Sequence, residues 1–175
     1  MWRIAITSPS AVSITIGRFL MLPTAKIATW GWLIIGVFGL GIELDNIRVA
    51  ETEGIKYMPA MPVAMHVSEK LKKEEQCDMV ICLSHLGYEY EHEKVNDKML
   101  AMQSENIDVI IGGHTHTFLE KPETILNKNN EKIIVNQAGW GGINLGYLNF
   151  VLDSKKSSKN FNAQSVILIK ETRGK

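Results

Sequence analysis

Three short apolar runs, rich in β-branched residues, alternate with two amphipathic stretches in the middle of the chain. The runs are LIIGVFGLG (33–41), DMVICLSH (78–85) and IDVIIGGH (107–114), and the stretches are PVAMHVSEKLKKEEQ (62–76) and NDKMLAMQSEN (96–106). Continuous apolar runs that end at glycine or histidine are typical of strands buried on both faces, whereas the stretches have apolar residues at helical spacing. Strands that alternate with crossover helices predict an α/β fold built on a parallel βαβαβ sheet.

The two predicted helices have recognisable first turns. Pro62 opens the first helix, in which Val63, Val67 and Leu71 are spaced four residues apart. Asn96 stands in the N-cap position of the second. Both stretches are therefore predicted to be helices that start close to these residues.

After Pro122 the alternation of strand and helix stops. Three further strand candidates follow, separated by turns rich in glycine, serine, lysine and asparagine: EKIIVNQAG (131–139), LGYLNFVLD (145–153) and AQSVILIKE (163–171). Strands joined by such turns favour an antiparallel meander, so the whole sheet is predicted to be mixed. The basic run KKSSK (155–159) is interpreted as a solvated turn.

Residues 1–33 differ from the rest of the chain. They show neither a sustained helical nor a sustained strand period, so no element is predicted there. The apolar run 27–42 contains four glycines and is shorter than the about 20 residues of a membrane-spanning helix, which favours a buried strand and a Gly-rich turn. We therefore predict a separate N-terminal segment (1–33), non-native or disordered, and one domain (34–171).

The composition narrows the range of partners. Lys and Arg total 19, as do Asp and Glu, which gives no electrostatic basis for a nucleic-acid partner. Cys77 and Cys82 would lie about 16 Å apart along a strand, too far for a disulfide. Both cysteines are therefore predicted to be free thiols.

Histidines follow two of the predicted strands. His85 ends the second strand, and His114 and His116 follow the third, behind Gly112 and Gly113. The carboxyl ends of parallel strands meet at one edge of a sheet, where functional loops gather. In an extended segment, residues i and i+2 project to the same side, and glycines permit unusual φ and close approach. Three imidazoles are thus predicted to bind one or two ions of Zn, Mn, Fe, Co or Ni, the alternative being a His-x-His segment hydrogen-bonded to nearby carbonyls.

Other patterns are interpreted as structural. His66, on the first helix, is predicted to be a surface or packing residue, and His92, in YEYEHEK, a solvated one. GLGIEL (39–44) follows a strand as a dinucleotide-binding loop would, but Leu44 stands where that fingerprint requires glycine or alanine. A dinucleotide-binding module is therefore disfavoured.

Three sequence blocks together resemble the calcineurin-like metallophosphoesterases, most closely the catalytic domain of 5′-nucleotidases. The blocks are ICLSHLGY (81–88), IDVIIGGHTH (107–116) and VNQAGWGGINLGYLNF (135–150), in the family's order. The resemblance covers residues 34–170 and implies the C-terminal half of a metallophosphoesterase sandwich. It also implies a hydrolase of phosphomonoesters such as nucleotides, in which two metal ions bind the phosphate and activate a water.

The resemblance implies roles for individual residues. His85 and His114 would ligate one ion and His116 the other, while Gly112 and Gly113 would form the turn that carries the pair. Four more residues match the block beside the metal site and are candidates for lining it: Asn136, Gln137, Gly139 and Gly142.

The carboxylate motifs of the family are missing from this sequence. Those enzymes also need Asp-x-His, Gly-Asp and Asn-His blocks, and none of these combinations occurs here. The aspartates stand elsewhere, at Asp45, Asp78, Asp97, Asp108 and Asp153. Because three neutral imidazoles do not neutralise two divalent ions, we expect at most one weakly bound ion, no catalytic residue in this chain and no activity of the chain alone.

Two interpretations follow. The chain is a truncated 5′-nucleotidase-type hydrolase of nucleotide catabolism, or it is a non-catalytic metal-binding or interaction fragment of the same fold. A half-sheet exposes an unpaired edge and an apolar face, which favours self-association. Analogy with exported family members implies a periplasmic or cell-envelope location.

Overall fold

The protein is described from a computed structural model. It describes the backbone of residues 2–7, 11–16, 26–30, 33–42, 57–153 and 156–167, and the side chains of residues 34–42 and 57–150. The chain divides into two compact units, each organised around one sheet. They are the α/β unit (Met21–His114 and Thr124–Val135) and the β unit (Met1–Leu20, Thr115–Glu123 and Asn136–Lys175).

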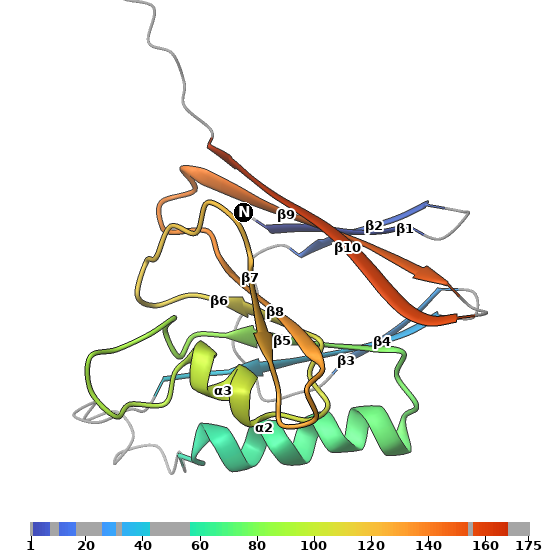
Figure 1. Ribbon diagram of the computed structural model, residues 1–175, viewed down its shortest axis with the longest axis horizontal. Coiled ribbons are helices and arrows are strands. Elements are labelled where there is room, and N and C mark those ends of the chain that lie inside the picture. The colour runs from blue at the N-terminus through green and yellow to red at the C-terminus, as the bar shows by residue number, and fades with distance from the viewer. Residues whose placement is uncertain are drawn as a thin grey trace, which may run out of the picture. The chain divides into compact units, whose positions relative to one another are not determined.

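The α/β unit is built on a mixed sheet with the strand order β3-β4-β5-β6-β8-β7 (Figure 1). Strands β4, β5 and β6 are parallel to one another, and β3 is antiparallel to β4. The predicted α/β class with a mixed sheet is therefore confirmed. The strand bounds are β3 Lys26–Trp30, β4 Leu33–Leu40, β5 Met79–Ser84, β6 Val109–Gly112, β7 Glu123–Leu126 and β8 Lys132–Gln137.

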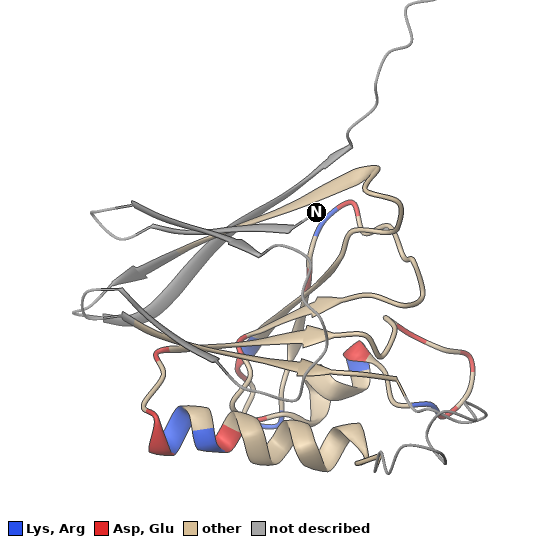
Figure 2. Ribbon diagram, turned by 180° about the vertical axis from the view of Figure 1, so that it is seen from behind, with Lys and Arg blue, Asp and Glu red and all other residues tan. Residues whose placement is uncertain are grey.

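Two helices connect the parallel strands, as the sequence pattern predicts. Helix α2 (Ala60–Glu69) continues into a π-helical turn, η1 (Lys70–Glu74), where the charged residues gather (Figure 2). Helix α3 (Asp97–Gln103) begins at the predicted cap, because the Asn96 side chain accepts a hydrogen bond from the Met99 amide at 3.0 Å. Both helices lie on one face of the sheet (Figure 1).

The main core of the α/β unit lies between these helices and the sheet. Residues two apart on a strand, such as Val80 and Cys82, face the same side of the sheet, and both belong to this core. Burying each large apolar side chain contributes about 1.5–3 kcal/mol. The cluster comprises Phe38, Leu40, Ala60, Ala64, Leu71, Cys77, Val80, Cys82, Leu86, Leu100, Ala101, Ile107, Ile110, Ile133 and Val135.

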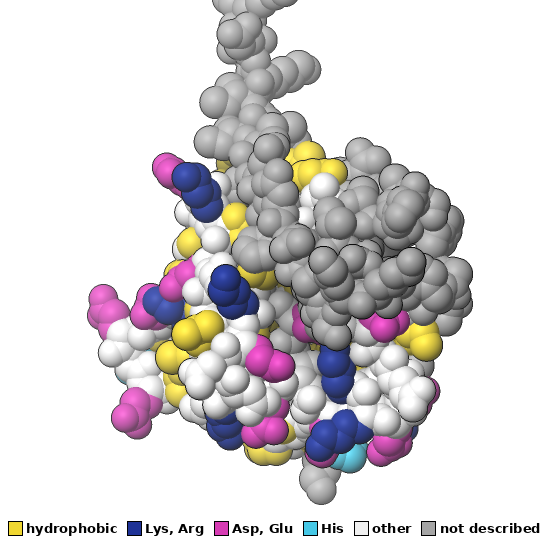
Figure 3. Space-filling model, turned by 45° about the vertical axis from the view of Figure 1, so that its right-hand side comes forward, with side chains coloured by type: hydrophobic (Ala, Val, Ile, Leu, Met, Phe, Trp, Pro, Cys, Tyr) yellow, Lys and Arg dark blue, Asp and Glu magenta, His cyan; other side chains and the backbone are white. Residues whose placement is uncertain are grey.

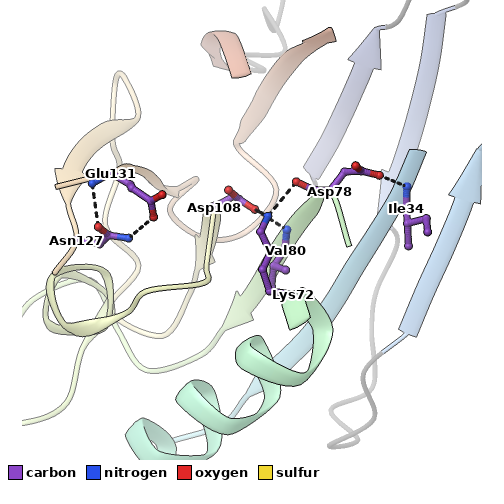
Figure 4. A network of polar contacts seen from close by, with 7 residues as sticks. All are labelled: Ile34, Lys72, Asp78, Val80, Asp108, Asn127 and Glu131. Carbon is purple, nitrogen blue, oxygen red and sulfur yellow. Dashed lines mark hydrogen bonds and ion pairs between the residues drawn. The ribbon is translucent and has the colours of Figure 1, made fainter. Parts of the chain in front are cut away.

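Two aspartates connect neighbouring strands at the amino ends of β5 and β6. Asp78 precedes β5, and its Oδ2 accepts a hydrogen bond from the Ile34 amide of β4 at 2.8 Å. Asp108 precedes β6, and its Oδ2 accepts from the Val80 amide at 2.8 Å and from the Lys72 ammonium at 3.3 Å (Figure 4). Both carboxylates therefore stabilise strand register, at the end of each strand opposite to the histidines.

The β unit contains a four-stranded sheet with the order β10-β9-β1-β2. Its strands are β1 Trp2–Thr7, β2 Ala11–Ile16, β9 Asn144–Asp153 and β10 Lys156–Ile167. Strands β9 and β10 form the antiparallel hairpin that the C-terminal pattern predicts, and β1 pairs parallel to β9. The three predicted C-terminal strands are divided between the two sheets, because β8 belongs to the sheet of the α/β unit.

The structure corrects several predictions about single strands. The pattern predicts no element in residues 1–33, yet β1, β2 and β3 lie there, and β7 is likewise not predicted. The run KKSSK, interpreted as a turn, belongs to β10 from Lys156 onward. Strand β1 lies between the nearby β2 and the distant β9 in its sheet, and its own sequence has no period that reveals it. Residues 168–171 of the third predicted C-terminal strand lie outside the described residues.

Both cysteines are buried free thiols, as predicted, and burial raises the pKa of Cys77 and Cys82. The apolar run 27–42 forms most of β3 and all of β4 rather than a helix. Within the described part of the chain, no helix has the length and apolar character that a membrane span requires.

Candidate functional site

His85 and His114 come together in the α/β unit. Strands β5 and β6 are parallel neighbours, so the residues after their carboxyl ends lie at the same edge of the sheet. The imidazole rings of His85 and His114 are in edge-to-face contact, with centroids 5.1 Å apart and planes inclined by 62°. Two of the three predicted metal ligands are thus adjacent within one unit.

Gly113 provides the space for this pair. A side chain at Gly113 would place its Cβ 3.1 Å from Nδ1 of His85 and 3.5 Å from the Ser84 carbonyl oxygen. The first of these distances is shorter than comfortable packing allows, so the His85 ring occupies the room that the missing side chain leaves. The group that lies close to this glycine is thus the His85 ring.

The loop that carries His85 is fixed by main-chain and side-chain hydrogen bonds. The His85 amide donates to the Leu40 carbonyl at the end of β4, at 2.9 Å. The Leu86 amide donates to Ser84 Oγ at 3.1 Å, and the Tyr90 hydroxyl donates to the Leu86 carbonyl at 2.6 Å. These bonds hold the backbone on both sides of His85.

Asp97 lies beneath the same loop and is fully buried. Its amide donates to the Gly87 carbonyl at 2.8 Å, which joins the start of α3 to the loop. Burial raises the pKa of the Asp97 carboxyl to about 7, and the nearby Ser84 hydroxyl acts in the opposite direction. Neither carboxylate oxygen has a hydrogen bond of normal geometry in the described part of the chain.

The backbone of GGHTH is not extended. Strand β6 ends at Gly112, and the φ angle is positive at His114 (75°) and His116 (56°) but at neither preceding glycine. The expectation of unusual φ at the glycines is therefore wrong, and the same-side rule for extended residues does not apply. A left-handed residue other than glycine costs about 1–2 kcal/mol, so its surroundings must hold it.

His116 lies in the β unit and is exposed. Its ring stacks on that of Trp140, with centroids 6.1 Å apart and planes inclined by 24°. Gly139, with φ of 68°, allows the neighbouring Phe118 ring to pack, because a Cβ there would lie 2.4 Å from that ring. Trp140 and Phe118 are themselves about half exposed.

The residues predicted to line the site have different surroundings. Gln137 and Asn136 are fully buried, and in the described residues the Asn136 amide group has no hydrogen-bond partner. Gln137 Oε1 accepts hydrogen bonds from the Thr115 hydroxyl, at 3.1 Å, and from the Thr117 amide. Gly142 has a φ of 74°, and the space around its Cα is open.

The residues present fit part of a metal coordination shell. Imidazole is a common ligand of divalent metal ions, and the rings of His85 and His114 are neighbours, with centroids 5.1 Å apart. Among the residues that the structure describes, no three His, Cys, Asp or Glu side chains form a group that could hold a metal ion. Asp78 and Asp108 lie at the opposite strand ends and Asp97 is in the interior, so none of them completes the shell.

Comparison with known proteins assigns the family. A model of the calcineurin-like phosphoesterase family matches residues 13–118, more than half of the chain. The chain belongs to this family of metallophosphoesterases, in which divalent metal ions are expected. The match begins upstream of residue 34, so it includes part of the N-terminal segment that the sequence blocks leave outside the resemblance.

Within the family the chain is related to 5′-nucleotidases. It is 33% identical over 121 residues to a trifunctional nucleotide phosphoesterase of Bacillus subtilis, covering 69% of this chain and 8% of the relative. It is 28% identical over 156 residues to the 5′-nucleotidase of Bos taurus, covering 82% of this chain and 26% of the relative.

A solved structure shows the same fold. The 5′-nucleotidase precursor from Thermus thermophilus superposes with a TM-score of 0.68 at 22% identity, over 82% of this chain and 29% of that chain. The present chain thus spans less than a third of the length of each of these three proteins.

Proposed function

We propose that this chain carries the histidine part of a 5′-nucleotidase-type metal site, where a phosphomonoester such as a nucleotide is hydrolysed. The observation that carries the proposal is the His85–His114 pair at the carboxyl ends of two adjacent parallel strands. The names of the relatives, nucleotide phosphoesterase and 5′-nucleotidase, supply the substrate class.

In the complete site of the family, to which this chain would contribute its histidines, His85 and His114 would hold one divalent ion through imidazole nitrogens and His116 would hold a second. Zn, Mn, Fe, Co and Ni all suit imidazole. When bound, such ions supply Lewis acidity at phosphorus and lower the pKa of a coordinated water. The contribution of this chain is to present the nitrogens: Gly113 leaves room for the His85 ring, and the Leu40 carbonyl fixes the His85 backbone.

We further infer that the chain alone has at most weak catalytic activity and binds at most one ion. The bridging carboxylates of the family are absent from the sequence, and Asp78 and Asp108 already bind strand amides. The same observation favours a second candidate function, a non-catalytic metal-binding fragment of the fold.

Hydrolysis assays separate the two candidates. The chain is incubated with AMP or p-nitrophenyl phosphate and added Mn²⁺ or Zn²⁺, beside His116→Ala and the control His66→Ala. Enzymes usually turn over at about 1–1,000 s⁻¹, and we expect a rate far below this. Hydrolysis that depends on metal and is abolished by His116→Ala but not by His66→Ala supports the hydrolase. Metal uptake without hydrolysis supports the non-catalytic candidate. Absence of metal uptake contradicts both.

A further inference from the structure

Asp97 lies beneath the loop that carries His85, in the same unit as the His85–His114 pair. Its side chain is fully buried at the first position of α3. In the part of the chain that the structure describes, neither of its carboxyl oxygens has a hydrogen bond of normal geometry. A buried carboxyl in such surroundings costs free energy, so stability alone does not explain this residue.

The first turn of α3 is joined to the loop through the main chain. The Asp97 amide donates a hydrogen bond to the Gly87 carbonyl at 2.8 Å, and the Lys98 amide donates to the Tyr88 carbonyl at 3.3 Å. Neither bond involves the side chain at position 97. Substitutions of the Asp97 side chain therefore leave this anchor between helix and loop in place.

Ser84 connects the Asp97 carboxyl with the backbone on both sides of His85. Ser84 is the buried last residue of β5, and its Oγ accepts a hydrogen bond from the Leu86 amide at 3.1 Å. A hydroxyl that accepts a hydrogen bond still has its own proton to donate. Burial raises the pKa of the Asp97 carboxyl, and the Ser84 hydroxyl opposes this rise, as a hydrogen-bond donor does. The Asp97 carboxyl thus orients the hydroxyl that holds the Leu86 amide.

The turn held in this way determines where the His85 imidazole lies. The His85 amide donates to the Leu40 carbonyl at 2.9 Å, and the His85 ring contacts the His114 ring with centroids 5.1 Å apart. The His85 side chain is exposed, so its own packing restrains it less than the backbone on either side does. A shift of this turn would move one imidazole of the pair relative to the other.

We propose that Asp97 is a positioning residue for the metal site. Through Ser84 it holds the turn that places the His85 imidazole beside that of His114. This inference rests on the proposed function, because the ion concerned is the one that these two histidines would bind. A ligand that is already ordered loses less conformational freedom when it binds, and this raises affinity. Asp97 acts through the backbone of the turn and not as a ligand.

Four variants separate positioning from stability. Asp97→Ala removes the carboxyl, and Ser84→Ala removes the hydroxyl by a smaller change. Asp97→Asn is the matched control, because it keeps the shape of the side chain and an oxygen that accepts from Ser84. Asp108→Asn weakens a carboxylate that binds the Val80 amide at the opposite end of the strands, so it destabilises the same unit away from His85. Urea unfolding verifies that each variant is folded.

The first measurement is hydrogen exchange of the Leu86 amide without metal, followed by NMR relative to the Ile81 amide within β5. We expect at least about tenfold faster relative exchange in Asp97→Ala and in Ser84→Ala, and wild-type exchange in Asp97→Asn and Asp108→Asn. Unchanged relative exchange in folded Asp97→Ala would show that the carboxyl does not hold the turn, and would overturn the inference.

The second measurement is equilibrium dialysis against Mn²⁺, which reports the ion assigned to His85 and His114. We expect affinity to fall about 10- to 100-fold in Asp97→Ala, as is typical when a residue that supports a metal ligand is removed, and to be retained in Asp97→Asn and Asp108→Asn. Unchanged affinity in Asp97→Ala, or an equal loss in Asp108→Asn, would overturn the positioning role alone. A wild-type chain that binds no Mn²⁺ would overturn the proposed function and with it the metal role of Asp97.

The route through Ser84 has a test of its own. Because Ser84→Ala and Asp97→Ala remove the two ends of one contact, the double variant should lose no more affinity for Mn²⁺ than the weaker of the two single variants. Losses that multiply in the double variant would show that the two residues act independently, and would overturn the inference.

Discussion

Asp97 combines two features that seldom occur together in a single residue. It is the first residue of α3, where a carboxylate is favoured by the helix dipole, and it is also fully buried. Burial dominates, because the pKa of the carboxyl is raised from 3.8 to about 7. The protonated form of Asp97 is therefore the form that the folded α/β unit prefers.

This preference predicts how stability depends on pH. The pKa of the Asp97 carboxyl is higher in the folded state than in the unfolded state. The contribution of Asp97 to the stability of the folded protein is therefore fully present below pH 3.8 and is lost as the pH rises through 7. Asp97→Asn has no carboxyl at this position and stays neutral. Between pH 5 and pH 8 the free energy of unfolding of the wild type should therefore fall by roughly 2–3 kcal/mol more than that of Asp97→Asn. Urea unfolding of both proteins at the two pH values measures the difference. Parallel pH dependence of the two proteins would contradict a proton on Asp97.

The histidines show how far single residues can be predicted from sequence. The positions of His85 and His114 at neighbouring strand ends follow from the apolar runs and the rule for parallel sheets. The left-handed φ of His114 and His116 does not, because no local sequence pattern indicates it. The contact of Gln137 with Thr115 likewise joins residues that are 22 positions apart, which no local pattern reveals.

At the scale of elements, β4 contains two glycines with different surroundings. A Cβ at Gly36 would lie 3.0 Å from Cys77 Sγ and from both terminal methyl groups of Leu71. A Cβ at Gly39 would meet only the Leu83 carbonyl oxygen, at an ordinary 3.7 Å. Gly36 is therefore required for close packing of the segment after α2 against β4, and Gly39 is not.

This difference predicts opposite tolerance to the same change. Gly36→Ala should destabilise the protein by about 1–3 kcal/mol through overpacking. Gly39→Ala, in the same strand, should be neutral or slightly stabilising, because alanine restricts the unfolded chain. Urea unfolding of the two variants provides the comparison, and equal destabilisation by both would mean that strand conformation and not packing sets the effect.

Prediction of elements from the sequence succeeds where the local pattern is strong. The helices α2 and α3 and the strands β4, β5, β6 and β8 follow from periodicity, and Asn96 caps α3 as expected. The strands β1, β2, β3 and β7 are not recognised, since their sequences lack a sustained period, although β1 pairs with the nearby β2 and β3 with the nearby β4. A weak local pattern therefore limits the prediction even where the pairing strand is close in the sequence.

At the scale of the whole molecule, charge does not point to a polyanionic partner. Lys and Arg equal Asp and Glu in number, and basic and acidic side chains are interspersed on the face shown in Figure 3. The functional signal lies instead in the imidazoles that follow β5 and β6. The family assignment rests on the match over residues 13–118.

The central claim is that His85 and His114 form a metal-binding pair. Equilibrium dialysis against Mn²⁺, with the bound metal quantified by mass spectrometry, tests this claim. The proteins compared are the wild type, the double variant His85→Ala/His114→Ala and the control His66→Ala/His92→Ala. The control removes two exposed histidines that lie elsewhere in the chain. We predict that the wild type and the control bind about one ion with weak affinity and that the first double variant loses at least about tenfold in affinity. Equal binding by all three proteins, or no binding by the wild type, would contradict the account.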